Sequence, residues 1–597
     1  MIKETLHELQ TEIAKWLESV GVTEPVVVLE RAVAAEFGDY STNVAMRYAK
    51  TLKQSPFELA EKLVAHLNES GIEVLARAEA AQPGFVNIHL TVAAKIAHFR
   101  TIRVASDTFG HNTTHQREKW VIEHTSPNPN KAMHLGHLLN NLIGMGIVRL
   151  LKASGAEVVS DAVYNNRGIA IAKAMYGYLV HMKKEANLPT DSVYWNEHQS
   201  EWYTPAEKNL RPDLFITECY RLGEKDFSDS PEVEAMVRQM VVDWEAKDAP
   251  TWKLWEKTLE YAYAGIDMTL QRLGSHWDSV WYEHEHYQKG KDYVQEGLNK
   301  GIFTKLVDGA VLTNIEEAYG ISDTILLKKD GTSLYITQDL ALTDQKKKQF
   351  NADKLVWVVG SEQTLAFRQL FAVCEQLGIG AVIDFTHISY GYVGLRDENG
   401  AFKKMSSREG TAVFADDVID AVKATINDRF VAEEKHDEAT RENLSETLAI
   451  AAVKFAFLKS DSKQNVLFDI EQSVDVQGDS GMYVMYTYVR TQSILRKAGG
   501  VVPTEFVVPE ALEAEASLVR TLLYYESVVQ KSVDDLSVHH VAQYLLELSS
   551  EFNSWYAKET VLDGSEREAY KLVLVDAVAA TLHNGLSLLG IQTVNEM

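Results

Sequence analysis

Residues 120–162, WVIEHTSPNPNKAMHLGHLLNNLIGMGIVRLLKASGAEVVSDA, decide the fold. A short apolar strand, Trp120–Glu123, ends in a Pro/Asn loop. A helix then begins near His134 and runs to about Ala153, and a second strand follows over Glu157–Ala162. Strand, loop, helix and strand of these lengths make a βαβ unit, which predicts a parallel, Rossmann-type sheet.

The chain on either side of this unit predicts two other kinds of structure. Before it lies a small α+β pattern, with a helix over 1–20, a strand at VVVLE (26–30), a helix from Pro56 and a strand at Phe85–Leu90. After about Asp420 helical periodicity dominates to the end. We expect an N-terminal α+β domain (1–112), a Rossmann-type catalytic domain (113–420) with a helical insertion near 180–300, and a C-terminal α-helical bundle domain (421–597). Within the catalytic domain, Leu355–Val359 and Phe385–Tyr390 are further buried-strand candidates.

Composition limits the class of protein. The 597 residues imply two to four domains, and 46% hydrophobic with 24% charged residues is typical of a soluble globular protein. Apolar runs stay short and the N-terminus is amphipathic and acidic, which argues against a membrane span or a signal peptide. Two distant cysteines, Cys219 and Cys374, argue against structural zinc or a disulfide framework and fit a reducing cytoplasm. The net charge of −26 argues against non-specific nucleic-acid or DNA binding. It leaves room for a local basic groove, because charges are screened beyond about 8 Å.

The first chemical motif is His134-Leu135-Gly136-His137, at the predicted start of a helix. Free N–H groups and the helix dipole favour phosphate at that position. Histidines at i and i+3 share one face and can donate hydrogen bonds to a phosphate in the transition state. The alternative is a pair of surface histidines.

The second motif is Lys404-Met405-Ser406-Ser407-Arg408, about 270 residues later. A loop carrying Lys404 and Arg408 can close over a triphosphate and stabilise the leaving pyrophosphate. Taken alone it could be a solvated loop. Together, in this order, the two motifs resemble the HIGH and KMSK signatures of class I aminoacyl-tRNA synthetases.

Over essentially its whole length the sequence resembles arginyl-tRNA synthetases. The stretches that carry the resemblance are EHTSPNPNKAMHLGHLLNNLIG, YNNRGIAIAKAM, DGTSLYITQDLA, KMSSREGT, the C-terminal GMYVMY through SILRKA to LLGI, and FGDYSTN near the N-terminus. The resemblance implies ATP-dependent activation of L-arginine and its transfer to the 3′-terminal adenosine of tRNA(Arg).

The resemblance also implies an arginine site. Glu123, Tyr335 and Asp339 match positions that recognise the guanidinium, and Asn128 and Gln363 match those that hold the amino and carboxyl groups. A guanidinium offers five donors and a permanent charge, so carboxylates are the expected partners. From the residues alone, either carboxylate could instead be a helix cap or part of a surface ion pair.

For ATP, the resemblance assigns catalytic roles to His134, His137, Lys131, Lys404 and Arg408. Gly136, Met405 and Ser406 join the two histidines as nucleotide-binding residues. Ser407 replaces the usual second lysine of KMSK. Lys131, three residues before His134, stands where relatives lacking that lysine carry a compensating one, although it could be a solvated loop lysine.

For tRNA, the resemblance implies that Tyr483, Tyr486 and Met597 contact the anticodon. A core role for the tyrosines is the alternative. FGDYSTN (37–43) matches the family's N-terminal domain, which is thought to touch the outer corner of the tRNA. The family also requires tRNA for the first step, and we expect no editing domain.

Some positions depart from the family pattern. Asn166 stands where an aspartate is usual, Ala170 and Ala172 replace a commoner polar pair, and Gln338 replaces an arginine. These differences bear on the tuning of the pocket.

The implied cofactor is ATP with Mg²⁺ carried in on the nucleotide, with no dedicated metal site on the protein. The implied partners are tRNA(Arg) and L-arginine, with no DNA and no membrane, and we expect a cytoplasmic monomer. Rival interpretations are another class I synthetase of the cysteinyl or glutamyl type, a smaller nucleotidyltransferase sharing HxGH, and a catalytically silent tRNA-binding paralogue.

Overall fold

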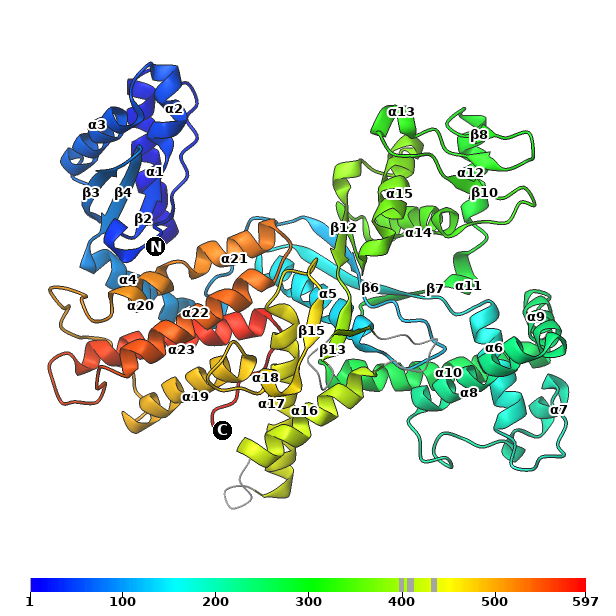
Figure 1. The fold of residues 1–597 in the computed structure, drawn as a ribbon. Helices are drawn as coiled ribbons and strands as arrows, with labels where there is room; N and C mark the ends of the chain where they lie inside the picture. Colours follow the sequence, from blue (N-terminus) through cyan, green and yellow to red (C-terminus); the bar gives the residue numbers. More distant parts are fainter. Residues whose placement is uncertain (1, 397–401, 405–412, 431–436) are drawn as a thin grey trace.

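The computed structural model describes residues 2–396, 402–404, 413–430 and 437–597. Figure 1 shows a small N-terminal part in blue, a central parallel sheet with helices beyond it, and a C-terminal group of helices in yellow to red. The predicted fold class is confirmed. A parallel sheet forms the core of the central part, an α+β domain precedes it, and a helical domain follows.

The central sheet has the order β12-β11-β5-β6-β7, and every neighbouring pair is parallel. Its strands are β5 (Lys119–Glu123), β6 (Glu157–Tyr164), β7 (Ser279–Tyr282), β11 (Lys354–Gly360) and β12 (Phe385–Tyr390). Helix α5 (Leu135–Ala153) connects β5 to β6 as predicted, and its mostly buried residues pack on the sheet. The carboxyl ends of β5, β6 and β11 therefore meet at one edge.

The segment predicted as a helical insertion is mostly helical, as Figure 1 shows on its right-hand side. Its helices before β7 are α7 (Ser192–Glu197), α8 (Pro212–Asp229), α9 (Pro231–Glu245) and α10 (Ala249–Arg272), and α6 (Ile169–His181), which precedes the predicted segment, packs against α8 and α9. A separate cluster of buried aromatic and aliphatic side chains, including Trp195, Trp202 and Phe215, holds them together. The prediction was wrong over 279–282, which forms strand β7 at the edge of the parallel sheet.

A second group of elements lies between β7 and β12. It holds the antiparallel sheet β10-β9-β8 and packs around its own apolar cluster, which includes Phe303, Leu326 and Leu340. Its elements are α11 (Glu283–His286), α12 (Gly290–Asn299), β8 (Thr304–Lys305), β9 (Val311–Leu312), α13 (Glu316–Tyr319), β10 (Ile325–Leu327), α14 (Tyr335–Phe350) and α15 (Thr364–Leu377). Helix α14 matters most for function, because it carries two of the predicted site residues.

The N-terminal domain is built on an antiparallel sheet of order β1-β2-β4-β3. Its elements are α1 (Ile2–Ser19), β1 (Glu30–Arg31), β2 (Tyr40–Thr42), α2 (Val44–Leu52), α3 (Pro56–Glu69), β3 (Leu75–Ala81), β4 (Phe85–Leu90) and α4 (Val92–Ala105). The strand at Phe85–Leu90 and the helix from Pro56 are confirmed. The strand predicted at VVVLE is wrong, since 26–29 has no regular structure.

A three-stranded sheet, β14-β13-β15, links the central sheet to the C-terminal helices. It consists of β13 (Val393–Arg396), β14 (Phe402–Lys404) and β15 (Val466–Phe468). Strand β14 pairs antiparallel with β13, and β15 pairs parallel with β13. The KMSSR motif therefore begins at the end of a strand, and its remaining residues lie outside the described part of the chain.

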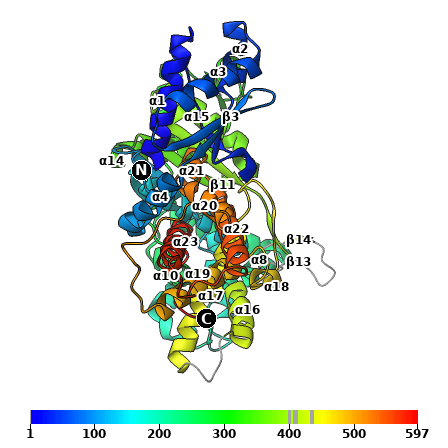
Figure 2. The ribbon, with the colours of Figure 1, turned by 90° about the vertical axis from the view of Figure 1, so that its left-hand side faces the viewer.

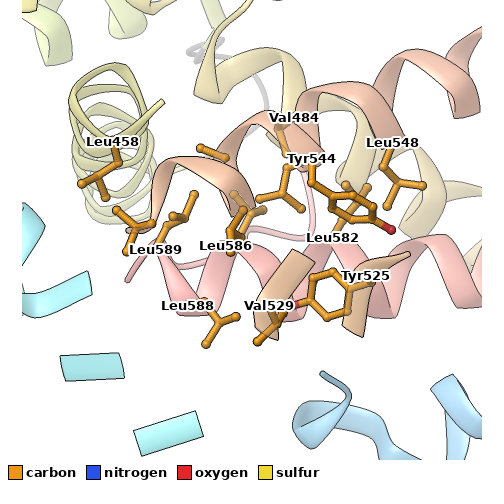
Figure 3. Packing of buried hydrophobic residues seen from close by; sticks show 14 of the residues in the cluster. Leu458, Val484, Tyr525, Val529, Tyr544, Leu548, Leu582, Leu586, Leu588 and Leu589 are labelled. Carbon is orange, nitrogen blue, oxygen red and sulfur yellow. The ribbon is translucent and has the colours of Figure 1, made fainter. Parts of the chain in front are cut away.

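The C-terminal domain is a helical bundle. Its helices are α16 (Ala415–Phe430), α17 (Glu438–Leu458), α18 (Ile470–Ser473), α19 (Gly481–Lys497), α20 (Ala516–Leu523), α21 (Tyr525–Asp534), α22 (His539–Tyr556) and α23 (Glu568–Leu588). Figure 3 shows its core, where Val484, Leu548 and Leu582 from three helices meet. Helix α16 runs across residue 420, so the chain enters the bundle without a linker there.

The N-terminal domain docks on this bundle through the FGDYSTN segment. The Tyr524 hydroxyl donates to the backbone carbonyl of Asp39, and the rings of Tyr40 and Tyr524 lie edge to face at 5.3 Å. The Arg31 guanidinium pairs with Glu547 and lies 4.6 Å from the Tyr524 ring centre. Figure 2 shows the N-terminal domain standing above α20 and α22. Residues at both ends of the chain thus form one interface.

No helix in the described ranges combines the length and the apolar character needed to cross a membrane.

Candidate active site

The loop after β5 begins with an unusual turn. Thr125 and Ser126 have φ of 72° and 33°, a region that a β-branched residue such as threonine rarely adopts. Helix α5 holds the turn in place. Asn140 accepts a hydrogen bond from the Thr125 backbone N–H at 2.7 Å, and Asn141 donates to the Thr125 hydroxyl at 3.1 Å. Helix α5 therefore holds the loop after β5 in this strained turn.

Glu123 ends β5 at the carboxyl edge of the sheet, and its side chain is 13% exposed. Its Oε1 accepts a hydrogen bond from the Ser126 hydroxyl at 3.1 Å, and its Oε2 accepts one from Lys346 Nζ at 2.7 Å. Of the alternatives open at the sequence level, an ion pair is present, but it is buried and does not lie on the surface.

Tyr335 and Asp339 lie one turn apart on α14, as their spacing predicts. The Tyr335 side chain is 78% exposed, and Asp339 is partly buried. Burial, with a second contribution from the Glu123 carboxylate, raises the pKa of Asp339 to about 7. The two acids therefore lie close enough to repel each other, and a cation between them would relieve that repulsion.

Asn128 and Gln363 both lie on loops that follow sheet strands, and both are exposed. Asn128 is in the loop after β5. Gln363 ends the short 3₁₀ turn after β11, the strand that pairs with β5 through the register Trp357↔Glu123. The two amides thus belong to the same edge of the sheet as Glu123.

The two histidines of HLGH form a reciprocal cap at the start of α5. His134 Nδ1 accepts a hydrogen bond from the Gly136 N–H at 3.1 Å, and His137 Nδ1 accepts from the His134 N–H at 3.4 Å. The rings stack with centroids 3.9 Å apart and an interplanar angle of 18°. Because both Nδ1 atoms accept, each neutral ring carries its proton on Nε2 and can donate from there.

Both imidazoles are neutral at physiological pH. Burial, helped by the Lys131 ammonium, lowers the pKa of His134 to about 4, and burial with His134 and Lys131 lowers the pKa of His137 well below its usual value. They can therefore donate hydrogen bonds without carrying a full positive charge. A Cβ at position 136 would lie 3.0 Å from His134 Cε1, so a larger residue there would push the His134 ring aside by a few tenths of an ångström.

Lys131, in the same loop, is partly buried and acts electrostatically on both histidines. The structure describes Lys404 by its backbone alone, at the end of β14. Met405, Ser406 and Arg408, and with them Ser407, lie outside the described residues.

Asn166, which departs from the family pattern, is buried beside the insertion helices. Its side-chain amide donates to the Tyr263 hydroxyl at 3.2 Å, and its Oδ1 accepts from the His284 N–H at 3.3 Å. The surroundings are aromatic, and Trp255 donates to the Asn166 carbonyl at 2.6 Å. A neutral amide satisfies these partners without burying a negative charge among aromatic rings, as an aspartate would.

The predicted anticodon residues gather at one side of the bundle. Tyr486 is 40% exposed, and the Arg490 guanidinium lies 4.7 Å from its ring centre. Tyr483, one turn earlier on α19, is partly buried. Met597 packs partly buried against the bundle core, where Arg496 holds the carbonyl of Asn595 at 2.9 Å. A pure core role does not fit Tyr486.

Within the described part of the chain, no group of three or more His, Cys, Asp or Glu side chains is placed to hold a metal ion. Both cysteines, Cys219 and Cys374, are buried and unpaired as thiols.

Two residues of this site were missed at the sequence level. Asp161 stands in register with Glu123 on the neighbouring strand, and Lys346 joins both acids from α14. A signal for Lys346 existed, since it lies seven residues, or two helical turns, after Asp339 and therefore shares its face. Strand β6 runs on to Tyr164, and only its register against β5 places Asp161 opposite Glu123, so no local signal in the sequence marks Asp161.

Comparison with known proteins matches three family models along the chain. The class I tRNA synthetase (R) catalytic domain covers residues 100–470, the DALR anticodon binding domain 484–597, and the arginyl tRNA synthetase N terminal domain 7–90. Together they account for nearly the whole chain in the order of the three structural parts.

Similar proteins agree with these matches. The arginine–tRNA ligase of Phocaeicola vulgatus is 31% identical over the full length of both chains, and that of Bacteroides thetaiotaomicron is 32% identical over 96% of each. Among solved structures, the Thermus thermophilus arginyl-tRNA synthetase has a TM-score of 0.80 at 22% identity, covering 99% of this chain and 100% of that one. The Plasmodium falciparum arginyl-tRNA synthetase gives 0.77 at 18% identity, covering 99% of each.

Proposed function

The chain belongs to the arginyl-tRNA synthetase family, and from that premise we propose that it activates L-arginine with ATP and transfers the arginyl group to tRNA(Arg). One structural observation carries the proposal. A single strand, turn and helix, from β5 to α5, bears an acid at the strand's end and a pair of neutral histidines at the helix start. An acid suits a guanidinium and the helix start suits a phosphate, so the two substrates would meet on one unit.

For arginine, we propose that Glu123 and Asp339 bind the guanidinium and that Tyr335 stacks on it or hydrogen-bonds to it. Asn128 and Gln363 would hold the amino and carboxyl groups. Support comes from the repulsion between the two acids, which a planar cation would relieve, and from the exposure of the two amides. A site built this way rejects an analogue without the guanidinium, because the carboxylate of Asp339 would then lie near that of Glu123 without the ligand's positive charge.

For ATP, we propose that His134, His137 and Gly136 receive the nucleotide at the start of α5, with Lys131 beside them. The Nε2–H groups of the two rings would donate to phosphate oxygens, where charge grows in the transition state. Lys404 and Arg408 of the KMSSR loop would place full positive charges beside the phosphates. Met405 and Ser406 of the same loop would contact the nucleotide. Magnesium would arrive bound to ATP and neutralise its phosphates.

The reaction itself needs no protein nucleophile. The arginine carboxylate attacks the α-phosphorus, the bond to the β-phosphate oxygen breaks, and pyrophosphate leaves. The hydroxyl of the terminal tRNA adenosine then attacks the acyl carbon and releases AMP. The residues of the chain orient the reactants and stabilise charge.

For tRNA, we propose that Tyr486, Tyr483 and Met597 contact the anticodon, with bases stacking on the exposed ring. The three domains would then be 1–112 for the outer corner of the tRNA, 113–420 for catalysis and 421–597 for the anticodon. We further propose a cytoplasmic monomer that binds no DNA. The two unpaired thiols support a reducing compartment, and the acidic net charge supports the absence of DNA binding.

The test is aminoacylation of purified tRNA with each of the twenty amino acids, together with ATP–pyrophosphate exchange with and without tRNA. We expect charging with arginine alone. Charging with cysteine or glutamate would identify another class I synthetase, and tRNA binding without any exchange would identify a silent paralogue.

A further inference from the structure

A buried lysine stands behind the candidate arginine site. Lys346, on α14, is 1% exposed, and its Nζ lies 2.7 Å from Glu123 Oε2 and 2.8 Å from Asp161 Oδ2. The two acids face each other in register across β5 and β6. Neighbouring strands are about 4.8 Å apart, so two carboxylates placed there repel strongly unless a cation joins them.

Of the two acids, only Glu123 is exposed enough to accept a hydrogen bond from a ligand. Asp161 is fully buried, and its Oδ2 also accepts a hydrogen bond from Trp281 Nε1 at 2.8 Å. Glu123 is 13% exposed, and its two oxygens accept one bond each, from Lys346 and from Ser126. Each carboxylate oxygen can accept about two hydrogen bonds, so Glu123 keeps acceptor capacity on its exposed side.

Lys346 partly neutralises the acids that an arginine guanidinium would meet. Glu123, Asp161 and Asp339 form one group of acids, and Lys346 supplies one positive charge in bonded contact with two of them. An arriving guanidinium supplies a second. Without the lysine, the ligand's single charge would face three acids, and Glu123 would keep only the Ser126 hydroxyl of the two donors that orient it.

We propose that Lys346 is a positioning residue for arginine, which holds the Glu123 carboxylate in the direction that a guanidinium needs without touching the substrate. This inference rests on the proposed assignment of Glu123 to arginine binding. A carboxylate misplaced by about 1 Å can cost a factor of about 100 in reaction efficiency. Because Glu123 is assigned to arginine and not to ATP, we expect loss of the lysine to weaken arginine binding and to leave ATP binding unchanged.

The experiment measures arginine and ATP kinetics in pyrophosphate exchange with tRNA present. For Lys346→Met we expect the KM for arginine to rise about 10- to 100-fold, with the KM for ATP and kcat each within about threefold of wild type. Lys346→Arg keeps the charge and should lie closer to wild type than Lys346→Met. Lys348→Met, on the same helix but 75% exposed and paired with Asp344, is the matched control and should leave all constants unchanged.

Two outcomes would overturn the proposal. One is an arginine KM for Lys346→Met within twofold of wild type. The other is a loss shared equally by arginine KM, ATP KM and kcat, which would mark a purely structural lysine. If Lys346→Met does not fold, the double variant Asp161→Asn/Lys346→Met removes the lysine with its buried partner and is held to the same criteria.

Glu123→Gln separates this inference from the proposed function. An unchanged arginine KM in Glu123→Gln would refute the arginine site itself. A raised KM in Glu123→Gln beside an unchanged one in Lys346→Met would refute the role of the lysine alone.

Discussion

The imidazole rings of His134 and His137 stack 3.9 Å apart, and each Nδ1 accepts a backbone hydrogen bond at the start of α5. This pairing settles which nitrogen carries the proton on each ring. The histidines therefore combine two tasks, since they cap the helix with one nitrogen and present a donor with the other.

His137→Ala is expected to lower the rate of arginine-dependent pyrophosphate exchange by about 10²- to 10³-fold, because one donor to the phosphates is lost. The affinity for tRNA, measured by filter binding, should change by less than about threefold. His137→Asn, which keeps a side-chain donor, serves as the comparison and should lose less. Equal losses of exchange and tRNA affinity would contradict the assigned role.

Arginine binding should weaken as pH falls through about 7. The free protein holds the pKa of Asp339 at about 7, and the guanidinium prefers the ionised carboxylate. Below that pH, the dissociation constant of arginine should rise by up to about tenfold per pH unit, and above it the constant should level off. Calorimetry between pH 5.5 and 8.5 measures this directly. Asp339→Asn should bind weakly with no such slope, and a profile flat in the wild type would disprove the assignment.

The same carboxyl should cost stability at high pH. Its pKa in the folded state lies above the value of about 3.9 in an unfolded chain, so the penalty grows as pH rises and is complete above about 7. Asp339→Asn should therefore raise the free energy of unfolding by about 1–3 kcal/mol at pH 8 and by less at pH 5. Denaturant titrations at both pH values test this. If Asp339→Asn is less stable than wild type at pH 8, ionisation of the Asp339 carboxyl does not destabilise the fold.

Gly144→Ala should destabilise the protein and raise the KM for arginine. A Cβ at this position of α5 would lie 2.3 Å from His124 Cβ, next to the Thr125–Ser126 turn that Glu123 and Asn128 flank. Overpacking of this kind costs about 1–3 kcal/mol, which thermal unfolding would detect.

The matched variant is Gly146→Ala, two residues further along α5. Its Cβ would meet Val538 Cγ1 of the C-terminal bundle at 2.6 Å. It should also lower stability but leave the KM for arginine within about twofold of wild type. If both variants raise the KM for arginine equally, displacement of the Thr125–Ser126 turn does not explain the effect of Gly144→Ala.

Tyr486→Ala should raise the KM for tRNA by about 10- to 100-fold, since stacking of one base on an aromatic ring contributes about 1–3 kcal/mol. The ring is 40% exposed, with Arg490 against it. Tyr486→Phe keeps the stacking face and should stay near wild type in aminoacylation kinetics. Matching losses in both variants would point to the hydroxyl instead of the ring.

Local pattern was enough to predict much of the fold. The apolar strand at β5, the helix that His134 caps and the strand at Phe385–Tyr390 all have the predicted kind and nearly the predicted bounds. In each case the periodicity matches one element and turn residues mark its end. The four-residue spacing of Tyr335 and Asp339 likewise predicts one helical face, and both lie on α14.

The misses have physical causes too. The apolar run at 26–29 contains three valines and predicts a strand. Side chains instead bond the backbone of Val26, whose N–H donates to the Tyr48 hydroxyl at 2.8 Å and whose carbonyl accepts from Arg47 at 3.2 Å. Strand β7 has only four residues within a helical stretch, and it forms because the edge of β6 offers unpaired backbone groups.

The sequence by itself determined which chemical groups the protein carries and which of them share a local element. The tertiary structure decided their partners and charge states. Lys346 meets Glu123 across 223 positions of chain, and it does so because β5, β6 and α14 pack together. Protonation depends on burial and on charges nearby in space, so the neutral histidines and the raised pKa of Asp339 follow from the folded arrangement and from no local motif.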